Sequence, residues 1–293
     1  MNYPKITIVT PSYNQGNFLE ETILSVLGQN YPNLEFIIID GGSNDNSVEI
    51  IKKYEDKLTY WVSEKDKGQS HAINKGFAIA TGEILAWLNS DDMYLPGVLH
   101  SISKTIDLSN QGIYFGDCVH FKYQNDALTC YGSQIYKDFQ NNSLTVLDFI
   151  IQPSSFWTRK TWENVGALNE NMHYAFDWEW FIRAKQVGVA FNPIKSPLSL
   201  YRIHEAHKTG TGGSKRQKEI SEIYQEYNPE LHELYNSLCE ETLLIKSSLI
   251  KLINNLLRLL TLPPSYGVVL KLLKYYKYYP YSICDINQVS SML

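Results

Sequence analysis

The sequence predicts an α/β protein with a mostly parallel central sheet, and three observations lead to that prediction. Short β-branched runs alternate with helical patterns between residues 6 and 88, as in sheets whose parallel strands are connected by helices. Each run is followed by polar or acidic residues. The 293 residues, 44% hydrophobic and 19% charged, are enough for one large domain with an appendage, or for two small domains.

The first elements follow from the spacing of apolar residues. Residues 6–10 (ITIVT) form a β-branched run that Pro11 closes, which is typical of a buried strand. The other predicted strands are residues 34–39, 57–62 and 84–88. The predicted helices are residues 17–27, a segment that begins near residue 44, and residues 68–80. Strand and helix therefore alternate through the first third of the chain.

Polar residues gather where these strands end. In chain order the strand ends carry Ser12-Tyr13-Asn14, Asp40, Glu64-Lys65-Asp66 and Asp91-Asp92. Ligands of open α/β sheets bind at the carboxyl ends of the strands. We therefore expect the functional site at this edge of the sheet.

After residue 112 the pattern is mixed. Aromatic-rich strands and a helix over residues 178–187 are expected before residue 201. Residues 201–218 are basic and glycine-rich without periodicity, which predicts a mobile loop. Leu-rich helical segments follow from residue 219 onward.

Composition and charge exclude several classes of protein. The formal net charge of −5 argues against nucleic-acid binding. The four cysteines share no metal-ligand spacing, so we expect free thiols in a reducing compartment. The N-terminus lacks a signal-peptide pattern and no apolar run is long enough to span a bilayer, so the expected location is the cytoplasm.

The pair Asp91-Asp92 follows a predicted buried strand and is a candidate metal site. Mg²⁺ and Mn²⁺ take oxygen ligands, and one or two carboxylates suffice when a diphosphate supplies the others. The alternative is that the two aspartates only cap the next helix. The pair alone does not separate these interpretations.

Five motifs, taken in order, give a more specific indication. They are Thr10-Pro11-Ser12-Tyr13-Asn14, Asp40-Gly41-Gly42-Ser43, Ser63-Glu64-Lys65-Asp66-Lys67-Gly68, Asn74-Lys75-Gly76 and Asn89-Ser90-Asp91-Asp92. This order closely resembles the family 2 glycosyltransferases over residues 5–208. The resemblance implies the glycosyltransferase A-type fold, a Rossmann-like nucleotide-binding sheet flanked by helices. It also implies a catalytic domain over residues 1–218, with a nucleotide-sugar half (1–111) and an acceptor half with a closing loop (112–218), and a helical region over 219–293.

The resemblance assigns roles at the strand ends. Pro11, Tyr13 and Asn14 are expected to line the pocket for the base, with Asp40 accepting a hydrogen bond from the base edge and Asp66 near base and ribose. Asp91 and Asp92 resemble the family's Asp-x-Asp element, of which one member contacts ribose and the other the metal. Many members have Asp where this chain has Asn89, and this leaves open which of the pair binds the metal.

A second cluster, residues 176–183, resembles the family segment that carries the general base. Direct displacement at the anomeric carbon needs a carboxylate to remove the proton of the acceptor hydroxyl. Asp177 fits by position, and Glu179 is the reserve candidate. On a helix these two residues do not face the same way, so only one serves the site. The alternative is an aspartate favoured only by the helix dipole.

The segments 201–204 and 207–209 resemble the family loop that closes over the diphosphate. His204 is a candidate metal or phosphate contact. Lys208, Lys215 and Arg216 are expected to neutralise the leaving diphosphate. Trp157, Trp178 and Trp180 are candidate stacking partners for the acceptor sugar, and the alternative for each is a place in the core.

Residues 240–281 combine apolar residues at helical spacing with interleaved lysines and late tyrosines. Such a basic amphipathic helix can lie on a membrane surface, which would place the enzyme peripherally on the inner face of the membrane. The alternative is a helix packed on the catalytic domain or in a homodimer interface. Sequence favours neither.

The resemblance implies a metal-dependent, inverting transfer of a hexosyl or N-acetylhexosaminyl group, with Mn²⁺ or Mg²⁺ as cofactor. A UDP-sugar donor, a saccharide or lipid-linked saccharide acceptor, and bacterial surface polysaccharide synthesis are the expected setting. A sugar-nucleotide pyrophosphorylase is disfavoured, since no Gly-rich loop with a basic residue follows the first strand. A non-catalytic sugar-nucleotide-binding or scaffolding protein remains the alternative.

Overall fold

The structure is a computed structural model that describes residues 3–124, 127–205, 208, 212–246, 277–278 and 280–293. The chain forms two units, Met1–Asn141 with Phe149–Thr211, and Asn142–Asp148 with Gly212–Leu293. The first unit contains the sheet and the second is helical. The predicted boundary between residues 218 and 219 falls inside helix α9 (Gly213–Tyr227).

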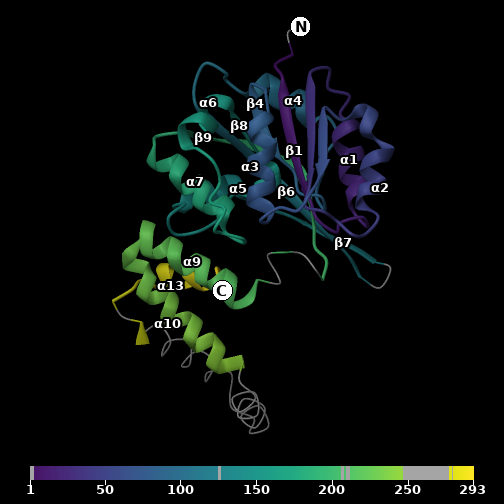
Figure 1. The fold of residues 1–293 in the computed structure, drawn as a ribbon. Helices are drawn as coiled ribbons and strands as arrows, with labels where there is room; N and C mark the ends of the chain where they lie inside the picture. Colours follow the sequence, from purple (N-terminus) through teal and green to yellow (C-terminus); the bar gives the residue numbers. More distant parts are fainter. Residues whose placement is uncertain (1–2, 125–126, 206–207, 209–211, 247–276, 279) are drawn as a thin grey trace. The chain divides into compact units, whose positions relative to one another are not determined.

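The first unit is built on a nine-stranded sheet of order β3-β2-β1-β4-β8-β6-β9-β5, with β7 paired to β6 (Figure 1). The strands are β1 (Ile6–Ser12), β2 (Leu34–Asp40), β3 (Tyr60–Ser63), β4 (Ile84–Trp87), β5 (Met93–Tyr94), β6 (Gly112–Gln124), β7 (Ala127–Gly132), β8 (Ser155–Thr158) and β9 (Ala190–Arg202). Strands β1 to β4 pair in parallel, as the alternation predicts. β8 runs antiparallel to β4 and β6, whereas β6 and β9 are parallel. The predicted α/β class is confirmed, with a mixed second half.

Helices connect and flank these strands. In the first unit they are α1 (Leu19–Leu27), α2 (Ser47–Lys53), α3 (Gln69–Ile79), α4 (Val98–Thr105), α5 (Ile135–Asn141), α6 (Arg159–Val165) and α7 (Phe176–Gln186), with 3₁₀ turns at Glu55–Lys57 and Gln152–Ser154. The first of these turns occupies the start of the predicted strand 57–62, so β3 begins only at Tyr60. The predicted loop 201–218 is also shorter than expected, because β9 continues to Arg202 and α9 begins at Gly213.

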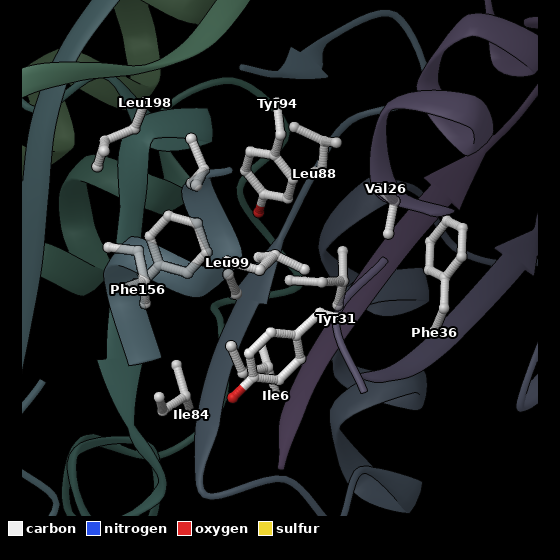
Figure 2. Packing of buried hydrophobic residues seen from close by; sticks show 14 of the residues in the cluster. Ile6, Val26, Tyr31, Phe36, Ile84, Leu88, Tyr94, Leu99, Phe156 and Leu198 are labelled. Atoms are coloured by element: carbon white, nitrogen blue, oxygen red, sulfur yellow. The ribbon is translucent and has the colours of Figure 1, made fainter. Parts of the chain in front are cut away.

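Both faces of the sheet bury hydrophobic side chains. Alternation along β1 places Ile6 and Ile8 on one face, where they join a core of aliphatic and aromatic residues with α1 and α4 (Figure 2). Val9 points to the other face, and α3 lies so close there that a Cβ added at Gly76 would be 2.4 Å from Val9 Cγ1. Each buried aliphatic side chain contributes roughly 1.5–3 kcal/mol relative to exposure.

An aromatic cluster lies beside α3 on this second face. Phe77 of α3 is 5.8 Å from Trp157 and 4.5 Å from Trp162, and Trp157 is 4.9 Å from Trp180, measured between ring centroids. Trp157, Trp178 and Trp180 are each 0% exposed. The prediction that these three stack on an acceptor sugar is therefore wrong, because completely buried rings have no face to offer a ligand.

The second unit contains α9, α10 (Pro229–Lys246) and α13 (Ile283–Ser290), together with residues 142–148. The hydroxyl of Tyr224 donates to the Val146 carbonyl at 2.7 Å, and Arg216 Nη1 donates to the Met292 carbonyl at 2.9 Å. These bonds connect α9 to residues 142–148 and to the segment that follows α13.

Most of the predicted basic tail, residues 240–281, lies outside the described residues, since 247–276 and 279 are not among them. Within the part that is described, no helix combines the length and the apolar character needed to cross a membrane. The prediction of peripheral membrane contact stays a prediction.

Candidate active site

The ends of three parallel strands meet at one edge of the sheet, as predicted. Ser12 pairs with Asp40, and Asp40 with Ser63, at the last positions of β1, β2 and β3. The loops that follow are connected to each other: the amide of Asn14 donates to Ser43 Oγ at 2.8 Å, and the amide of Asn44 donates to Asn14 Oδ1 at 2.9 Å. This edge is therefore a pre-ordered surface.

Asp40 shapes this edge from within. It is 0% exposed, and its carboxylate accepts hydrogen bonds from the amides of Gly42 and Ser43 and the hydroxyls of Ser43 and Ser63, at 2.5–3.1 Å. The predicted hydrogen bond from a base edge to Asp40 is not supported, because the buried carboxylate already accepts four bonds within the protein. Its observed part is to fix the turn after β2.

Two other predicted base-side residues reach the edge. Tyr13 is 59% exposed, so its ring is available to a ligand. Asn14 has a φ of 52°, a left-handed conformation that asparagine tolerates better than most residues. Pro11, by contrast, is buried within β1, where it pairs with Ile39.

Asp66 lies across from the turn after β2. Its Oδ1 accepts from the amide of Gly68 at 2.7 Å, and a Cβ added at Gly41 would lie 2.6 Å from its Oδ2. Glycine at position 41 therefore allows the carboxylate to approach the backbone closely. The structure brings Asp66 and the end of β2 together, as the motifs predicted.

Asp91 and Asp92 follow β4 but have different environments. Asp92 is 1% exposed, and it accepts from the Arg202 amide at 3.2 Å and from Asn89 Nδ2 at 3.3 Å. Burial and the neighbouring Asp91 carboxylate raise the pKa of Asp92 well above its ordinary value. The Asp91 side chain is 20% exposed, and its Oδ2 lies 3.0 Å from His204 Nε2.

Arg202, which sequence reasoning did not single out, supports this pair of aspartates. The backbone amide of Arg202 donates a hydrogen bond to Asp92, and its Nε donates to the Asp91 carbonyl at 3.1 Å. Its Nη2 donates to Glu21 Oε2 at 2.6 Å, and its guanidinium lies between the rings of Phe18 and Phe121. The signal was present in the sequence, since Arg202 stands in the same four-residue segment as His204.

The side chains at this turn include oxygen and nitrogen ligands that suit a hard divalent cation. No group of three His, Cys, Asp or Glu side chains within the described ranges is placed to hold a metal. A nucleoside diphosphate completes the coordination of Mg²⁺ or Mn²⁺ when the protein provides only one or two ligands. The Asp91 carboxylate and the His204 imidazole, already within 3.0 Å of each other, fit that requirement. The buried Asp92 is the less accessible of the two aspartates.

The predicted cationic residues fall in different parts of the chain. Lys208 Nζ donates to Gln69 Oε1 at 2.7 Å, in the first unit. Lys215 and Arg216 belong to α9 of the second unit, where Arg216 bonds the Met292 carbonyl. Their contact with a diphosphate stays a prediction.

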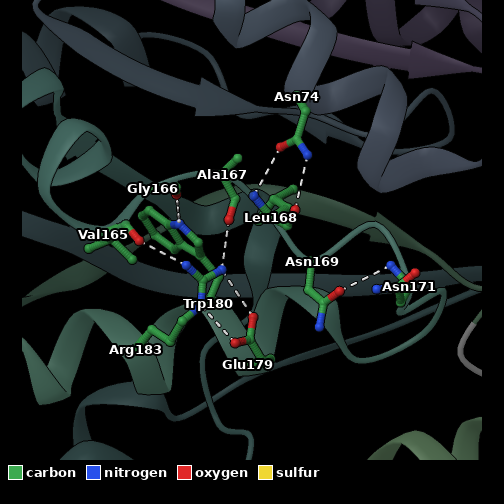
Figure 3. A network of polar contacts seen from close by, with 10 residues as sticks. All are labelled: Asn74, Val165, Gly166, Ala167, Leu168, Asn169, Asn171, Glu179, Trp180 and Arg183. Atoms are coloured by element: carbon green, nitrogen blue, oxygen red, sulfur yellow. Dashed lines mark hydrogen bonds and ion pairs between the residues drawn. The ribbon is translucent and has the colours of Figure 1, made fainter.

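The two candidate bases lie in the first turn of α7. Asp177 is half-buried, and its Oδ1 accepts from the Trp178 amide at 3.0 Å. Glu179 is 4% exposed and accepts from Arg183 at both carboxylate oxygens, at 2.7 and 3.1 Å (Figure 3). The reserve assignment of Glu179 as base is wrong, because its charge is neutralised in a buried ion pair.

The position of α7 is fixed by the segment before it. Arg183 donates to the carbonyls of Val165 and Ala167, each at 2.8 Å. Asn74 of α3 holds the same segment from the other side, exchanging hydrogen bonds with the Leu168 backbone at 2.9 and 3.0 Å (Figure 3). The Asn74-Lys75-Gly76 motif therefore connects the nucleotide-side helix α3 to the segment that precedes Asp177.

The chain is similar in sequence to known glycosyltransferases. A family model described as glycosyl transferase family 2 matches residues 7–165. An uncharacterized glycosyltransferase of Rickettsia typhi is 28% identical over 219 residues, which cover 71% of this chain and 67% of that protein. The glycosyltransferase GlyG of Streptococcus pneumoniae is 26% identical over 155 residues, covering 52% of this chain and 51% of that protein.

Solved structures share the fold. S. aureus TarS 1-349 in complex with UDP-GlcNAc has a TM-score of 0.59 at 16% identity, covering 76% of this chain and 67% of that one. Mannosyltransferase PcManGT from Pyrobaculum calidifontis, in complex with GDP-Man and Mn²⁺, has a TM-score of 0.63 at 15% identity, covering 100% and 86%. The family model spans more than half of the chain, and with the five ordered motifs this shows that the chain belongs to glycosyl transferase family 2.

Proposed function

We propose that this chain is a metal-dependent, inverting glycosyltransferase that moves a hexosyl or N-acetylhexosaminyl group from a nucleotide-sugar to a saccharide or lipid-linked saccharide hydroxyl. The observation that carries the proposal is the Asp91 carboxylate held 3.0 Å from His204 at the carboxyl end of β4. The UDP-GlcNAc and GDP-Man bound to the two solved structures support a nucleotide-sugar donor. We take a UDP-sugar as the first donor to test.

In this proposal, one group of residues binds the nucleotide-sugar donor and another group serves the acceptor. On the donor side, the exposed ring of Tyr13 offers a stacking face for the base, and Asp66 lies next to the backbone at Gly41. Asp91 and His204 would hold the cation, which when bound neutralises charge on the diphosphate. Lys208 adds a positive charge from the segment after β9.

On the acceptor side, Asp177 accepts the proton of the attacking hydroxyl. The hydroxyl oxygen forms a bond to the anomeric carbon while the bond between that carbon and the diphosphate oxygen breaks. The proton ends on the Asp177 carboxylate, and the electron pair of the broken bond leaves with the nucleoside diphosphate. Attack on the face opposite the leaving group inverts the anomeric configuration.

Both named relatives are bacterial proteins, and we extend the proposal to an acceptor in bacterial surface polysaccharide synthesis. Contact of the C-terminal residues with the membrane, or their use in a homodimer, belongs to the same proposal. Flotation of the full chain with anionic vesicles tests the first, and sedimentation tests the second.

Thermal unfolding tests the donor site directly. We expect UDP or GDP with Mn²⁺ to raise the melting temperature, since a ligand at a hundred times its Kd adds about 2.7 kcal/mol of stability. EDTA and Asp91→Asn should each remove most of that shift, whereas Asp56→Asn, at an exposed aspartate of the turn before β3, should not.

An assay for nucleoside diphosphate release, run beside the unfolding experiment, separates the two functional classes. Metal-dependent release of nucleoside diphosphate from a nucleotide-sugar supports an enzyme. Binding without any turnover would favour the non-catalytic sugar-nucleotide-binding alternative. No thermal shift with any nucleotide, in well-folded protein, would contradict a nucleotide-sugar site altogether.

A further inference from the structure

A continuous chain of amide hydrogen bonds runs from Lys208 into the sheet. Lys208 Nζ donates to Gln69 Oε1, and Gln69 Nε2 donates to Asn89 Oδ1, both at 2.7 Å. Asn89 Nδ2 then donates to Asp92 Oδ2 at 3.3 Å and to Gln152 Oε1 at 3.4 Å. Gln152 Nε2 ends the chain on the Trp87 carbonyl at 2.8 Å.

The direction of every bond in this chain is fixed by its inner end. The Trp87 carbonyl only accepts, so the Gln152 amide must direct its NH₂ group toward it and present its oxygen to the NH₂ group of Asn89. Asn89 consequently presents its oxygen to Gln69, and Gln69 presents its own oxygen to Lys208. The buried end of the chain therefore determines where an acceptor for the lysine ammonium lies.

The inner end is rigid because it is buried. Asp92 is 1% exposed and Gln152 is 5% exposed. The two middle residues come from separate elements: Gln69 is the first residue of α3, and Asn89 follows β4. Four segments far apart in sequence thus converge on one path. Of the three amides, the sequence had drawn attention only to Asn89, as the first residue of the Asn89-Ser90-Asp91-Asp92 motif.

At its outer end the path reaches the beginning of α7. Lys208 Nζ lies 5.7 Å from the centre of the Tyr174 ring and 5.1 Å from that of Phe176. Phe176 is the residue before Asp177. The ammonium is therefore placed by an amide oxygen and two aromatic rings, between the Asp91-Asp92 turn and the proposed general base.

We propose that Gln69 and Asn89 are positioning residues for the transfer reaction, holding the Lys208 ammonium where the departing diphosphate gains negative charge. This inference rests on the proposed function. Asparagine at position 89 suits the task, because it accepts from Gln69 and donates to Asp92 at the same time. An aspartate there would lose both donated bonds and would add a charge beside Asp91 and Asp92.

A double-mutant cycle tests whether the amides act through the lysine. Lys208→Met is expected to lower kcat by about 10²-fold, as loss of a preorganised contact to developing charge does. Gln69→Leu and Asn89→Ala are each expected to lower kcat by about 10-fold, with a smaller change in the KM for the donor. Adding either substitution to Lys208→Met should cause no further loss, since coupled residues are not additive.

Binding gives a second readout that does not depend on turnover. Titration calorimetry with UDP and GDP in Mn²⁺ should show weaker binding for Gln69→Leu, whereas uridine and guanosine, which lack phosphates, should bind both proteins equally. Gln111→Leu is the matched control, because Gln111 also accepts a side-chain hydrogen bond but lies next to the beginning of β6. Its kcat and its nucleotide affinity should equal those of the parent protein.

The possible outcomes distinguish failure of the positioning role from failure of the proposed transferase function. If the parent protein binds diphosphate but the Gln69 and Asn89 losses are fully additive with Lys208→Met, the positioning role is overturned and the transferase proposal stands. If Gln69→Leu weakens the binding of uridine and of UDP equally, the effect is structural and the positioning role is again overturned. If the parent protein binds neither UDP nor GDP, both proposals fail.

Discussion

Buried and partly exposed carboxylates occur together both at the strand-end edge and in the first turn of α7. At the edge, Asp40 is buried and the Asp91 side chain is 20% exposed. In α7, Glu179 is buried and Asp177 is half-buried. The two buried carboxylates are satisfied in different ways: Asp40 by four neutral donors, three of them from the turn that follows it, and Glu179 by a guanidinium one helical turn away.

This comparison shows how the same chemical group, a carboxylate, can stabilise the structure at one position and be open to a ligand at another. A carboxylate that accepts all its hydrogen bonds within the protein orders the backbone around it, as Asp40 orders the turn after β2. A partly exposed carboxylate, such as that of Asp91, can be reached by a ligand. Substitutions should therefore affect stability at the buried sites and activity at the exposed ones.

The largest expected effect is at Asp177. Asp177→Asn should lower kcat by about 10²–10⁴, because an amide cannot accept the proton of the acceptor hydroxyl. Its stability should change by less than about 1 kcal/mol, the usual value of a charge at a helix N-terminus. Kinetics with saturating donor check the rate and urea unfolding checks stability. Full activity in Asp177→Asn would remove Asp177 from the mechanism.

Glu179→Gln should give the opposite pattern. The substitution leaves Arg183 without its counter-ion in a site where the glutamate side chain is only 6% exposed, and we expect a loss of about 3 kcal/mol of unfolding free energy. Activity per folded molecule should be retained at low temperature. Glu163→Gln, at an exposed glutamate of α6, is the matched control. A stable but inactive Glu179→Gln would restore Glu179 as a candidate base.

A smaller effect is expected at Asp40. Asp40→Asn keeps one accepting oxygen but loses the charge, so we expect a loss of about 1.5–3 kcal/mol, as for hydrogen bonds to charged groups. All nucleotides should bind more weakly, because the turn after β2 is less well ordered. If Asp40 contacted a base directly, stability would be unchanged and the preference between UDP and GDP would shift instead. Urea unfolding and calorimetry distinguish these results.

The smallest effect is expected at Glu35 in β2, which is also a buried carboxylate. Burial raises the pKa of Glu35, but hydrogen bonds from Thr7 and Thr81 outweigh it and hold the pKa below the ordinary value of 4.5. A lowered folded-state pKa stabilises the protein above the unfolded-state pKa, and this contribution is lost as the pH falls through the folded-state value. The parent protein should therefore lose stability below about pH 4.5 more steeply than Glu35→Gln. Unfolding curves between pH 3 and pH 6 measure this, with Glu49→Gln as an exposed control, and equal slopes for both proteins would contradict it.

The first half of the fold was predictable because its signals are local. Runs such as residues 6–10 and 34–39 are too apolar to be anything but buried strands, and β1 and β2 contain them. The polar residues after these runs therefore follow the carboxyl ends of parallel strands, which places Asp40, Asp66 and Asp91 along the same edge of the sheet. The second half of the sheet mixes parallel and antiparallel strand pairs, so no repeating sequence pattern predicted β5 to β9.

The site assignments that proved wrong share a physical cause. Trp157, Trp178 and Trp180 have the chemistry of sugar-stacking residues, but ring packing on the second face of the sheet covers them completely. Glu179 has the chemistry of a base, but Arg183 occupies both of its oxygens. Residue type shows what a side chain is able to do, whereas burial determines whether a ligand can reach it.

The sequence by itself determined the fold class, the parallel arrangement of β1 to β4, the sheet edge at which we propose the site, and the family. These follow from hydrophobic periodicity and from motifs that are short in sequence. Only the tertiary structure decided that Asp92 is buried while Asp91 meets His204, and that Lys208 is connected to Asp92 through Gln69 and Asn89. The reason is distance along the chain: the amide that Asp92 accepts from belongs to Arg202, 110 residues away, and folding alone brings such partners together.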